Sequence, residues 1–224
     1  MKIVIFCGGL ATRFNNGKPG PLKPLIKIKG KTILERIMDL YKDVNNPEFI
    51  LLGGYKFNEL KNFCKNFKKY KVIPIDTGKL TPTGGRLLKI KKLVDNKKFF
   101  LTYGDSLINY DPKKSINNKK KFIISIYNYK IPYGVVYLDS KKKYIKNFLE
   151  KKYEIFINAG FFYLDSCIFN YIFSLNESFE RDVLPRVIKS RIKSHKVSFV
   201  ETDNWFPIDN KYDLDTIIKS KLIK

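Results

Sequence analysis

The stretch GGLATRFNNGKPGPLKPLIKIKG, Gly8 to Gly30, follows an apolar segment, Ile3–Phe6, whose continuous hydrophobicity predicts a buried strand. Two glycines open the stretch, and because they carry no Cβ the backbone can bend sharply there and come close to a ligand. Arg13, Lys18 and Lys23 place three cations on the same loop. The loop is therefore predicted to hold an anion. The phosphates of a nucleoside triphosphate suit its backbone N–H groups, its arginine and its lysine.

Two common phosphate-binding motifs are absent from this loop. It contains neither the GxxxxGK[ST] pattern of P-loops nor the GxGxxG pattern of dinucleotide-binding folds. An ordinary solvated turn can have the same glycine-rich, basic composition. The choice between the two interpretations therefore depends on what other segments bring to the same place.

The segments after the loop alternate between strand and helix patterns. Apolar runs predict strands over 2–7, 48–52, 71–75 and 99–103, and apolar residues at helical spacing predict helices over 32–44, 58–67 and 86–94. This alternation is typical of a mainly parallel sheet with helices on both faces. Right-handed crossovers bring the carboxyl ends of such strands to one edge, where open α/β sheets bind ligands. We expect the glycine loop, Asp76, the TPTGGR segment (81–86) and Asp105 at that edge.

The pattern changes after residue 110. Short β segments are predicted over 122–127, 134–138, 144–149 and 161–164, followed by helices over 167–174 and 183–189, a strand over 197–200 and a last helix. Because no repeat or flexible linker interrupts the chain, residues 1–224 are predicted to form a single domain. The fold class is α/β: a Rossmann-like, mainly parallel sheet flanked by helices, with a smaller β-rich lobe that faces the substrate.

Composition limits the other function classes. The net charge of +23 attracts polyanions, so nucleic-acid binding is an alternative, but the lysines are spread out, with runs only at 119–121 and 141–143. Three distant cysteines without CxxC spacing indicate a reducing compartment. No apolar stretch is long enough to span a bilayer, so we expect a cytoplasmic protein without membrane insertion. His195 is the only histidine and lies in a lysine-rich connection, which disfavours histidine-based catalysis.

Two aspartates stand at positions that suit a metal ligand. Asp105 ends the apolar segment LTYGD (101–105), where a carboxylate is poorly placed for packing, and Asp209 ends the aromatic run WFPID (205–209). Mg²⁺ is usually held by one or two carboxylates together with substrate phosphates, so a pair from distant parts of the sequence is the expected pattern. The alternative for Asp105 is a turn or cap residue. Thr83, in the TPTGGR segment, has the alternative of a helix cap.

Together these motifs resemble the sugar-1-phosphate nucleotidyltransferases, and within that family the glucose-1-phosphate cytidylyltransferases. The family signature GGxGTR…KPM/L…IxGK is matched by Gly8–Arg13, Lys23–Leu25, Ile28 and Gly30–Lys31. The DTG…TGGRL and TYGD motifs are matched by Asp76–Gly78, Thr83–Leu87 and Thr102–Asp105. The later FG, EK, NGGFF and WQPMD motifs correspond to Tyr133–Gly134, Glu150–Lys151, Asn158–Phe162 and Trp205–Asp209. The matches follow the family order over nearly the whole chain.

The resemblance implies a nucleotide-diphospho-sugar transferase fold and a role for each matched residue. Residues 1–110 would form the nucleotide-binding half and residues 111–224 the acceptor-binding half. Catalysis would depend on Arg13, Lys23 and Asp105. The nucleotide would be bound by Gly8, Gly9, Leu10, Thr12, Arg13, Lys23, Thr83, Gly84, Gly85, Arg86 and Gly104. The acceptor would be bound by Gly134, Glu150, Lys151 and Asn158, and Mg²⁺ by Asp105 and Asp209.

The implied reaction transfers CMP from CTP to a phosphorylated acceptor, such as glucose 1-phosphate, and releases pyrophosphate. The resemblance suggests a place in polysaccharide biosynthesis. A phosphate monoester has a second pKa of about 6 and is already ionised at neutral pH, so no general base is needed. UTP, dTTP or GTP, and a heptose phosphate or a phosphocholine-like acceptor, are alternatives, as is a basic nucleic-acid-binding protein on a catalytically silent transferase fold. A homo-oligomer is left open.

The chain departs from the family pattern in three places. Ala11 replaces a glycine, and if that position requires a positive φ the cost is about 1 kcal/mol. Ala159 likewise replaces a glycine near the acceptor. The segment between Phe63 and Val72 is shorter than in the glucose-1-phosphate cytidylyltransferases. These departures leave the acceptor and the number of subunits open.

Overall fold

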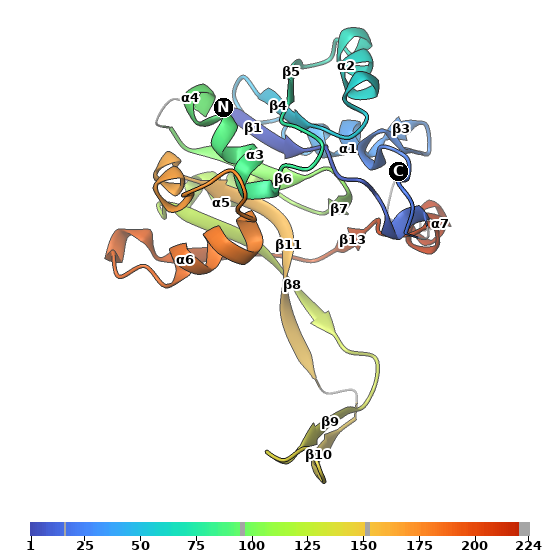
Figure 1. Cartoon of the computed structure of the whole chain (residues 1–224), viewed down its shortest axis with the longest axis vertical. Coiled ribbons are helices and arrows are strands. Elements are labelled where there is room, and N and C mark those ends of the chain that lie inside the picture. The colour runs from blue at the N-terminus through green and yellow to red at the C-terminus, as the bar shows by residue number, and fades with distance from the viewer. Residues whose placement is uncertain (16, 95–96, 151–152, 220–224) are drawn as a thin grey trace.

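The centre of the molecule is a seven-stranded sheet of order β12-β8-β11-β6-β1-β4-β5 (Figure 1). The computed structural model describes residues 1–15, 17–94, 97–150 and 153–219. The strands are β1 (Lys2–Phe6), β4 (Glu48–Gly53), β5 (Lys71–Asp76), β6 (Phe99–Tyr103), β8 (Phe122–Lys130), β11 (Glu154–Leu164) and β12 (Val197–Thr202). β11 runs antiparallel to β6 and β8, and the other neighbours are parallel. The predicted α/β class with a mainly parallel sheet is confirmed.

Both faces of the sheet are covered, which explains why its strands read as continuous apolar runs. In β1, Ile3 and Ile5 belong to one hydrophobic core and Val4 and Phe6 to the other. The first core includes residues of α1 (Ile33–Asp39) and α2 (Phe57–Asn66), and the second those of α3 (Thr83–Lys89), α4 (Lys91–Val94) and α6 (Leu184–Ile188). The remaining α-helices in the described ranges are α5 (Pro112–Asn117) and α7 (Lys211–Lys219). None of the helices in these ranges is both long and apolar enough to cross a membrane.

The helices of the first half lie where their pattern predicts, with shifted ends. Thr32 is the N-cap of α1, because its hydroxyl accepts the Glu35 N–H at 3.1 Å while the Glu35 carboxylate accepts the Thr32 N–H at 2.6 Å. α1 ends at Asp39, so the helix predicted over 32–44 is shorter than expected. The helix predicted over 86–94 begins earlier, at Thr83, and is interrupted at Ile90.

The second half differs more from expectation. The helix predicted over 167–174 is a 3₁₀ helix, Ser166–Tyr171, and the helix predicted over 183–189 is α6 preceded by a π-helical turn, Phe179–Val183. Two short strands that the sequence pattern does not indicate, β7 (Ser106–Ile108) and β13 (Trp205–Pro207), pair antiparallel with each other. A further small hairpin joins β2 (Lys27–Ile28) and β3 (Lys31–Thr32) within the first loop.

A two-stranded arm, residues 128–150 and 153–156, projects from the body (Figure 1). β8 and β11 run out of the main sheet into it, and β9 (Val135–Leu138) pairs with β10 (Ile145–Leu149) at its far end in a sheet of their own. The β segments predicted over 134–138 and 144–149 are therefore present. Apolar side chains more than half exposed on the arm are Tyr133, Tyr144, Ile145, Phe148 and Phe156. The division of roles at residue 110 stays a prediction.

Candidate active site

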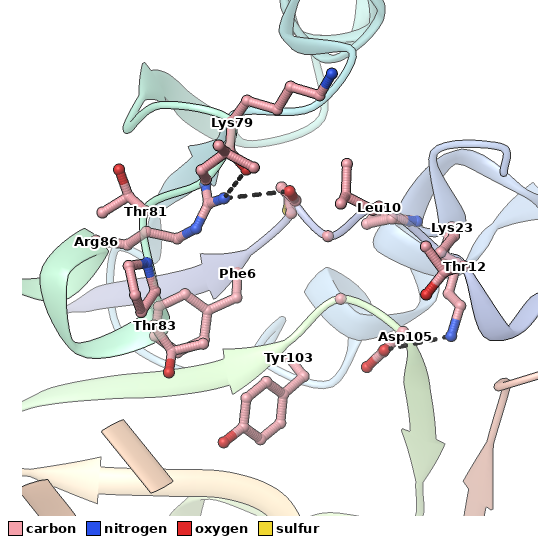
Figure 2. Close-up of a pocket in the computed structure, with 18 of the residues that line it drawn as sticks. Phe6, Leu10, Thr12, Lys23, Lys79, Thr81, Thr83, Arg86, Tyr103 and Asp105 are labelled. Carbon is pink, nitrogen blue, oxygen red and sulfur yellow. Dashed lines mark hydrogen bonds and ion pairs between the residues drawn. The ribbon is translucent and has the colours of Figure 1, made fainter. Parts of the chain in front are cut away.

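A cavity of about 460 Å³ lies at the carboxyl edge of the parallel strands. Its walls come from the loop after β1, the loop between β5 and α3, and the end of β6 (Figure 2). Of the residues expected to bind nucleotide, those that line it are Gly8, Gly9, Leu10, Thr12, Arg13, Lys23, Thr83, Arg86 and Gly104. The carboxyl ends of the parallel strands therefore bring these loops to one cavity. Asp76 lies apart from this cavity, and its carboxylate accepts the N–H of Gly78 at 2.9 Å in a turn.

The loop after β1 is held by hydrogen bonds to its backbone carbonyls. The N–H of Gly20 donates to the carbonyl of Leu10 at 2.9 Å, and the hydroxyl of Tyr55 donates to the carbonyl of Gly20 at 3.0 Å. Ala11 adopts a positive φ of 52°, the left-handed conformation in which a glycine is favoured. Gly8 has no room for a side chain, because a Cβ would lie 2.9 Å from the carbonyl carbon of Gly53. The backbone can therefore line the cavity directly at Gly8.

Lys23 lies between the two aspartates predicted as metal ligands. Its ammonium is 3.1 Å from Asp209 Oδ1 and 3.6 Å from Asp105 Oδ2, and only 8% of its side chain is exposed. The guanidinium of Arg13, 75% exposed, contacts Asp209 Oδ2 at 2.6 Å. Burial raises the pKa of Asp105, and the charge of Lys23 opposes that shift. Two carboxylates and two cations from distant parts of the sequence thus meet beside the cavity.

The donor set at this point fits Mg²⁺ only in part. Asp105 and Asp209 supply carboxylate oxygens, the ligand type that Mg²⁺ prefers, but Mg²⁺ takes six ligands and usually obtains the rest from waters and substrate phosphates. Within the described residues, no group of three or more His, Cys, Asp or Glu side chains could hold a metal on its own. These residues therefore fit a metal that binds together with a nucleotide.

Arg86 ties the walls of the cavity to one another. It is 5% exposed, and its guanidinium donates to Thr77 Oγ1 at 2.6 Å, to the Gly8 carbonyl at 3.2 Å and to the Lys79 carbonyl at 3.3 Å (Figure 2). Its pKa is lowered by burial. Arg86 lines the cavity as predicted, and in addition it fastens the loop after β1 to the loop after β5.

Gly84 and Gly85, also expected to bind nucleotide, lie behind the cavity wall. Both are buried, and neither lines the cavity. A Cβ on Gly85 would lie 1.9 Å from the Leu175 carbonyl oxygen, and one on Gly84 would lie 2.7 Å from that of Glu177. In this structure the two glycines allow residues 175–177 to pack closely against the start of α3.

A second cavity, of about 340 Å³, adjoins the first and shares Arg13, Tyr103 and Asp105 with it. It is lined by Asn158, one of the predicted acceptor-binding residues, beside a β-bulge where β11 changes register against β8. Gly160 in this bulge has a φ of +84°, and its N–H donates to the Asn158 side-chain oxygen at 2.9 Å. The wall also contains Glu180 and Trp205, for which we made no site prediction.

Two other predicted acceptor-binding residues, Gly134 and Glu150, are on the arm. Gly134 directly precedes β9, Glu150 directly follows β10, and neither lines either cavity. Figure 1 shows β9 and β10 at the far end of the arm, away from the start of α3. Lys151 lies outside the described residues. Within one chain, the structure thus brings together Asn158 and the nucleotide-side residues, but not Gly134 or Glu150.

The chain is similar to several known nucleotidyltransferases. No protein-family model matches the chain. A Bacillus subtilis (strain 168) protein named Probable glucose-1-phosphate cytidylyltransferase is 32% identical over 77% of this chain and 78% of its own. The D-glycero-alpha-D-manno-heptose 1-phosphate guanylyltransferase of Campylobacter jejuni is 30% identical over 92% of this chain and 93% of its own. The crystal structure of HddC from Yersinia pseudotuberculosis complexed with GMP-PN has a TM-score of 0.75 at 25% identity, covering 97% of this chain and 98% of its own.

The fold is that of the nucleotide-diphospho-sugar transferases. The chain belongs to the sugar-1-phosphate nucleotidyltransferase family. The resemblance inferred from its motifs is therefore confirmed, as is the fold that the resemblance implies. The relatives include both a cytidylyltransferase and a guanylyltransferase. They therefore establish nucleotidyl transfer as the class of reaction but not which base the nucleotide substrate carries.

Proposed function

We propose that the enzyme transfers CMP from CTP to a sugar 1-phosphate, with glucose 1-phosphate the first candidate, forming a CDP-sugar and pyrophosphate. The observation that carries this proposal is the meeting of Lys23, Asp105 and Asp209 where the two cavities join. Support for CTP comes from the DTG…TGGRL motif and from the cytidylyltransferase relative. A cytoplasmic location and a role in polysaccharide biosynthesis are part of the same proposal.

The larger cavity would hold CTP. The backbone of Gly8, Gly9 and Thr12 offers N–H groups to the triphosphate, and Arg13 adds a guanidinium that can bind phosphate oxygens in pairs. Thr83 and Arg86, on the opposite wall, would face the base and ribose. Lys23 would lie beside the α-phosphate, because it is buried and its ammonium contacts Asp105 and Asp209, which line the second cavity.

The chemical step needs two anions to be brought into line. An oxygen of the acceptor phosphate forms a bond to the α-phosphorus of CTP, while the bond from that phosphorus to the oxygen leading to the β-phosphate breaks. Pyrophosphate leaves with the electron pair of the broken bond. The attacking oxygen is already ionised at neutral pH, so catalysis consists of positioning and charge neutralisation. Lys23 and Arg13 supply fixed positive charge at this junction.

Asp105 and Asp209 would hold Mg²⁺ together with phosphate oxygens of the nucleotide. When bound, the ion would neutralise charge on the phosphates. The same two carboxylates contact the positive charges of Lys23 and Arg13. Removing divalent ions with EDTA is expected to abolish turnover, and adding Mg²⁺ back is expected to restore it.

A pyrophosphate-release screen tests the proposal directly. CTP, UTP, dTTP and GTP are each combined with glucose 1-phosphate, a heptose 1-phosphate and phosphocholine, and the product is identified by mass spectrometry. The highest rate is expected for CTP with glucose 1-phosphate. A higher rate for GTP with the heptose phosphate would assign different substrates within the same family. Release from none of the pairs, together with tight salt-dependent binding to random DNA or RNA, would favour the nucleic-acid-binding alternative.

We also propose that the enzyme acts as a homo-oligomer. The resemblance assigns Gly134, Glu150 and Lys151 to the acceptor, and an arm from a second copy would carry Gly134 and Glu150 to the second cavity. The exposed side chains of Tyr144 and Phe148 support this, because a two-stranded hairpin is only marginally stable without a surface to pack on. Light scattering measures the subunit number. Mixing an Asp105→Asn chain with a Glu150→Gln chain should restore activity if the arm acts between copies.

A further inference from the structure

Glu180 joins the two cavities through three hydroxyl groups. Its Oε2 accepts hydrogen bonds from Thr83 Oγ1 and from Ser178 Oγ, both at 2.7 Å, and its Oε1 accepts one from the hydroxyl of Tyr103. Thr83 lines the first cavity, Glu180 lines the second, and Tyr103 lines both. One carboxylate therefore contacts a side chain of each cavity.

The segment that carries Glu180 is firmly attached to the start of α3. The N–H of Gly85 donates to the Glu177 carbonyl at 3.1 Å, and the N–H of Phe179 donates to Thr83 Oγ1 at 2.9 Å. The Thr83 hydroxyl thus accepts a hydrogen bond from the N–H of Phe179 and donates one to Glu180. It therefore acts as both acceptor and donor. Glu180 itself lies in the π-helical turn, a rare conformation that is frequent at functional sites.

The hydroxyl of Tyr103, which donates to Glu180, is the only polar atom of its side chain. The ring stacks on Phe6 at a centroid distance of 5.7 Å and meets Phe162 edge-on at 5.9 Å. A Cβ on Gly160 would lie 2.7 Å from the ring, so the ring fills the space that this glycine leaves. Burial and the nearby carboxylate raise the pKa of Tyr103, so the hydroxyl keeps its proton. The ring thereby forms a fixed partition between the two cavities.

We propose that Glu180 is a positioning residue that couples the nucleotide cavity to the acceptor cavity. This coupling rests on the proposed function, in which the first cavity holds CTP and the second holds the acceptor phosphate. Through Thr83 it fixes the nucleotide wall, and through Tyr103 it fixes the partition against which the acceptor binds. A small error in either position would misalign the attacking oxygen and the α-phosphorus.

Three substitutions distinguish the effect of Glu180 on the nucleotide cavity from its effect on the acceptor cavity. Thr83→Val removes the hydroxyl on the nucleotide side and is expected to raise the KM for CTP about tenfold, with the acceptor KM little changed. Tyr103→Phe removes the hydroxyl on the partition and is expected to raise mainly the acceptor KM, by a similar factor. Glu180→Gln keeps the shape but removes one acceptor oxygen and the charge, so both KM values should rise and kcat should fall about a hundredfold.

Glu177→Gln is the matched control. Glu177 is close in sequence, but its carboxylate pairs with Arg186 at 2.9 Å and lines neither cavity, so both KM values and kcat should stay at the wild-type level. Thermal unfolding of each variant checks that it is folded. The double variant Tyr103→Phe/Glu180→Gln should be no worse in acceptor KM than Glu180→Gln alone, because the two residues act through one hydrogen bond.

Two results would overturn the proposal. One is wild-type KM values and kcat in folded Glu180→Gln, and the other is a uniform fall in kcat in all three variants without any change in KM. Inactivity of the wild-type enzyme with every substrate pair would instead contradict the proposed function. In that case calorimetric titration with CTP and with glucose 1-phosphate still decides the matter. Glu180→Gln should weaken both, and unchanged affinities would exclude the coupling.

Discussion

The backbone N–H of Ile208 donates a hydrogen bond to the carbonyl oxygen of Asp105 at 3.0 Å. This bond continues the antiparallel pairing of β7 with β13, in which Ser106 lies opposite Pro207. Because Asp209 directly follows Ile208, the pairing sets the two carboxylates on either side of the Lys23 ammonium. Two residues more than a hundred positions apart are therefore held together by backbone geometry.

The first prediction concerns Asp105. Asp105→Asn should reduce turnover about a hundredfold or more while the fold survives, because the change removes a charge from the reacting centre but keeps the side-chain shape. Pyrophosphate release measures the activity, and thermal unfolding measures the fold. Asp203→Asn, at an exposed position lining neither cavity, is the control and should retain wild-type turnover. Full activity in Asp105→Asn would rule out the metal role.

The second prediction separates the two cations. Lys23→Ala should lower the free energy of unfolding by about 1–2 kcal/mol in EDTA, since it leaves two partly buried carboxylates without their shared ammonium. Arg13→Ala should change it by less than about 0.5 kcal/mol, because that side chain is largely exposed. Both variants should have a lower kcat/KM for CTP than the wild-type enzyme. Urea denaturation and steady-state kinetics measure the two effects, and equal stability losses would contradict the difference in burial.

Much of the nucleotide side could be predicted from the sequence, because it depends on local patterns. Strand ends recur where apolar runs stop, and parallel topology brings those ends to one edge, so Gly8, Thr83 and Asp105 were expected together. Glu180 could not be found in this way. It lies in a π-helical turn, and its contact with Tyr103 depends on how the second half packs against α3.

The position of the acceptor-binding motifs could not be predicted from the sequence either. The motifs at Gly134 and Glu150 match the family, but pattern alone cannot tell whether a β segment joins the main sheet or leaves it. Here β9 and β10 pair with each other beyond the sheet. Similarly, the run Trp205–Pro207 is too short to be recognised as a strand, and its pairing with β7 depends on contacts distant in sequence.

The third prediction concerns backbone strain at Ala11. Its φ of 52° costs an alanine about 1 kcal/mol relative to glycine. Ala11→Gly should therefore raise the free energy of unfolding by up to about 1 kcal/mol, although the freer unfolded chain of the glycine variant offsets part of the gain. Ala159→Gly is the control. Ala159 is fully buried in β11 and is not among the described residues with positive φ, so this change should destabilise by about 1 kcal/mol. Urea denaturation measures both, and equal losses would contradict the strain at Ala11.

The last prediction concerns His195, which is buried away from both cavities. Its Nδ1 lies 2.6 Å from the hydroxyl of Tyr171, and its Nε2 lies 3.5 Å from the ammonium of Lys121 and 3.7 Å from the sulfur of Cys167. Burial lowers the pKa of His195, the charge of Lys121 lowers it further, and Asp165 acts in the opposite direction. Burial and the neighbouring Asp165 raise the pKa of Cys167 to about 12, so its thiol stays neutral at physiological pH.

A lowered pKa in the folded state means that the unfolded chain binds the proton more readily. The stabilisation from neutral His195 is therefore complete above an ordinary histidine pKa of about 6.5 and is lost progressively as the pH falls through the lower folded value. His195→Asn removes this titration but leaves the carboxylates of the chain unchanged. The difference in unfolding free energy between wild type and His195→Asn, measured with urea, should be constant above pH 7 and shrink as the pH falls toward about 5. A difference that stays constant over that range would show that His195 is protonated equally in both states.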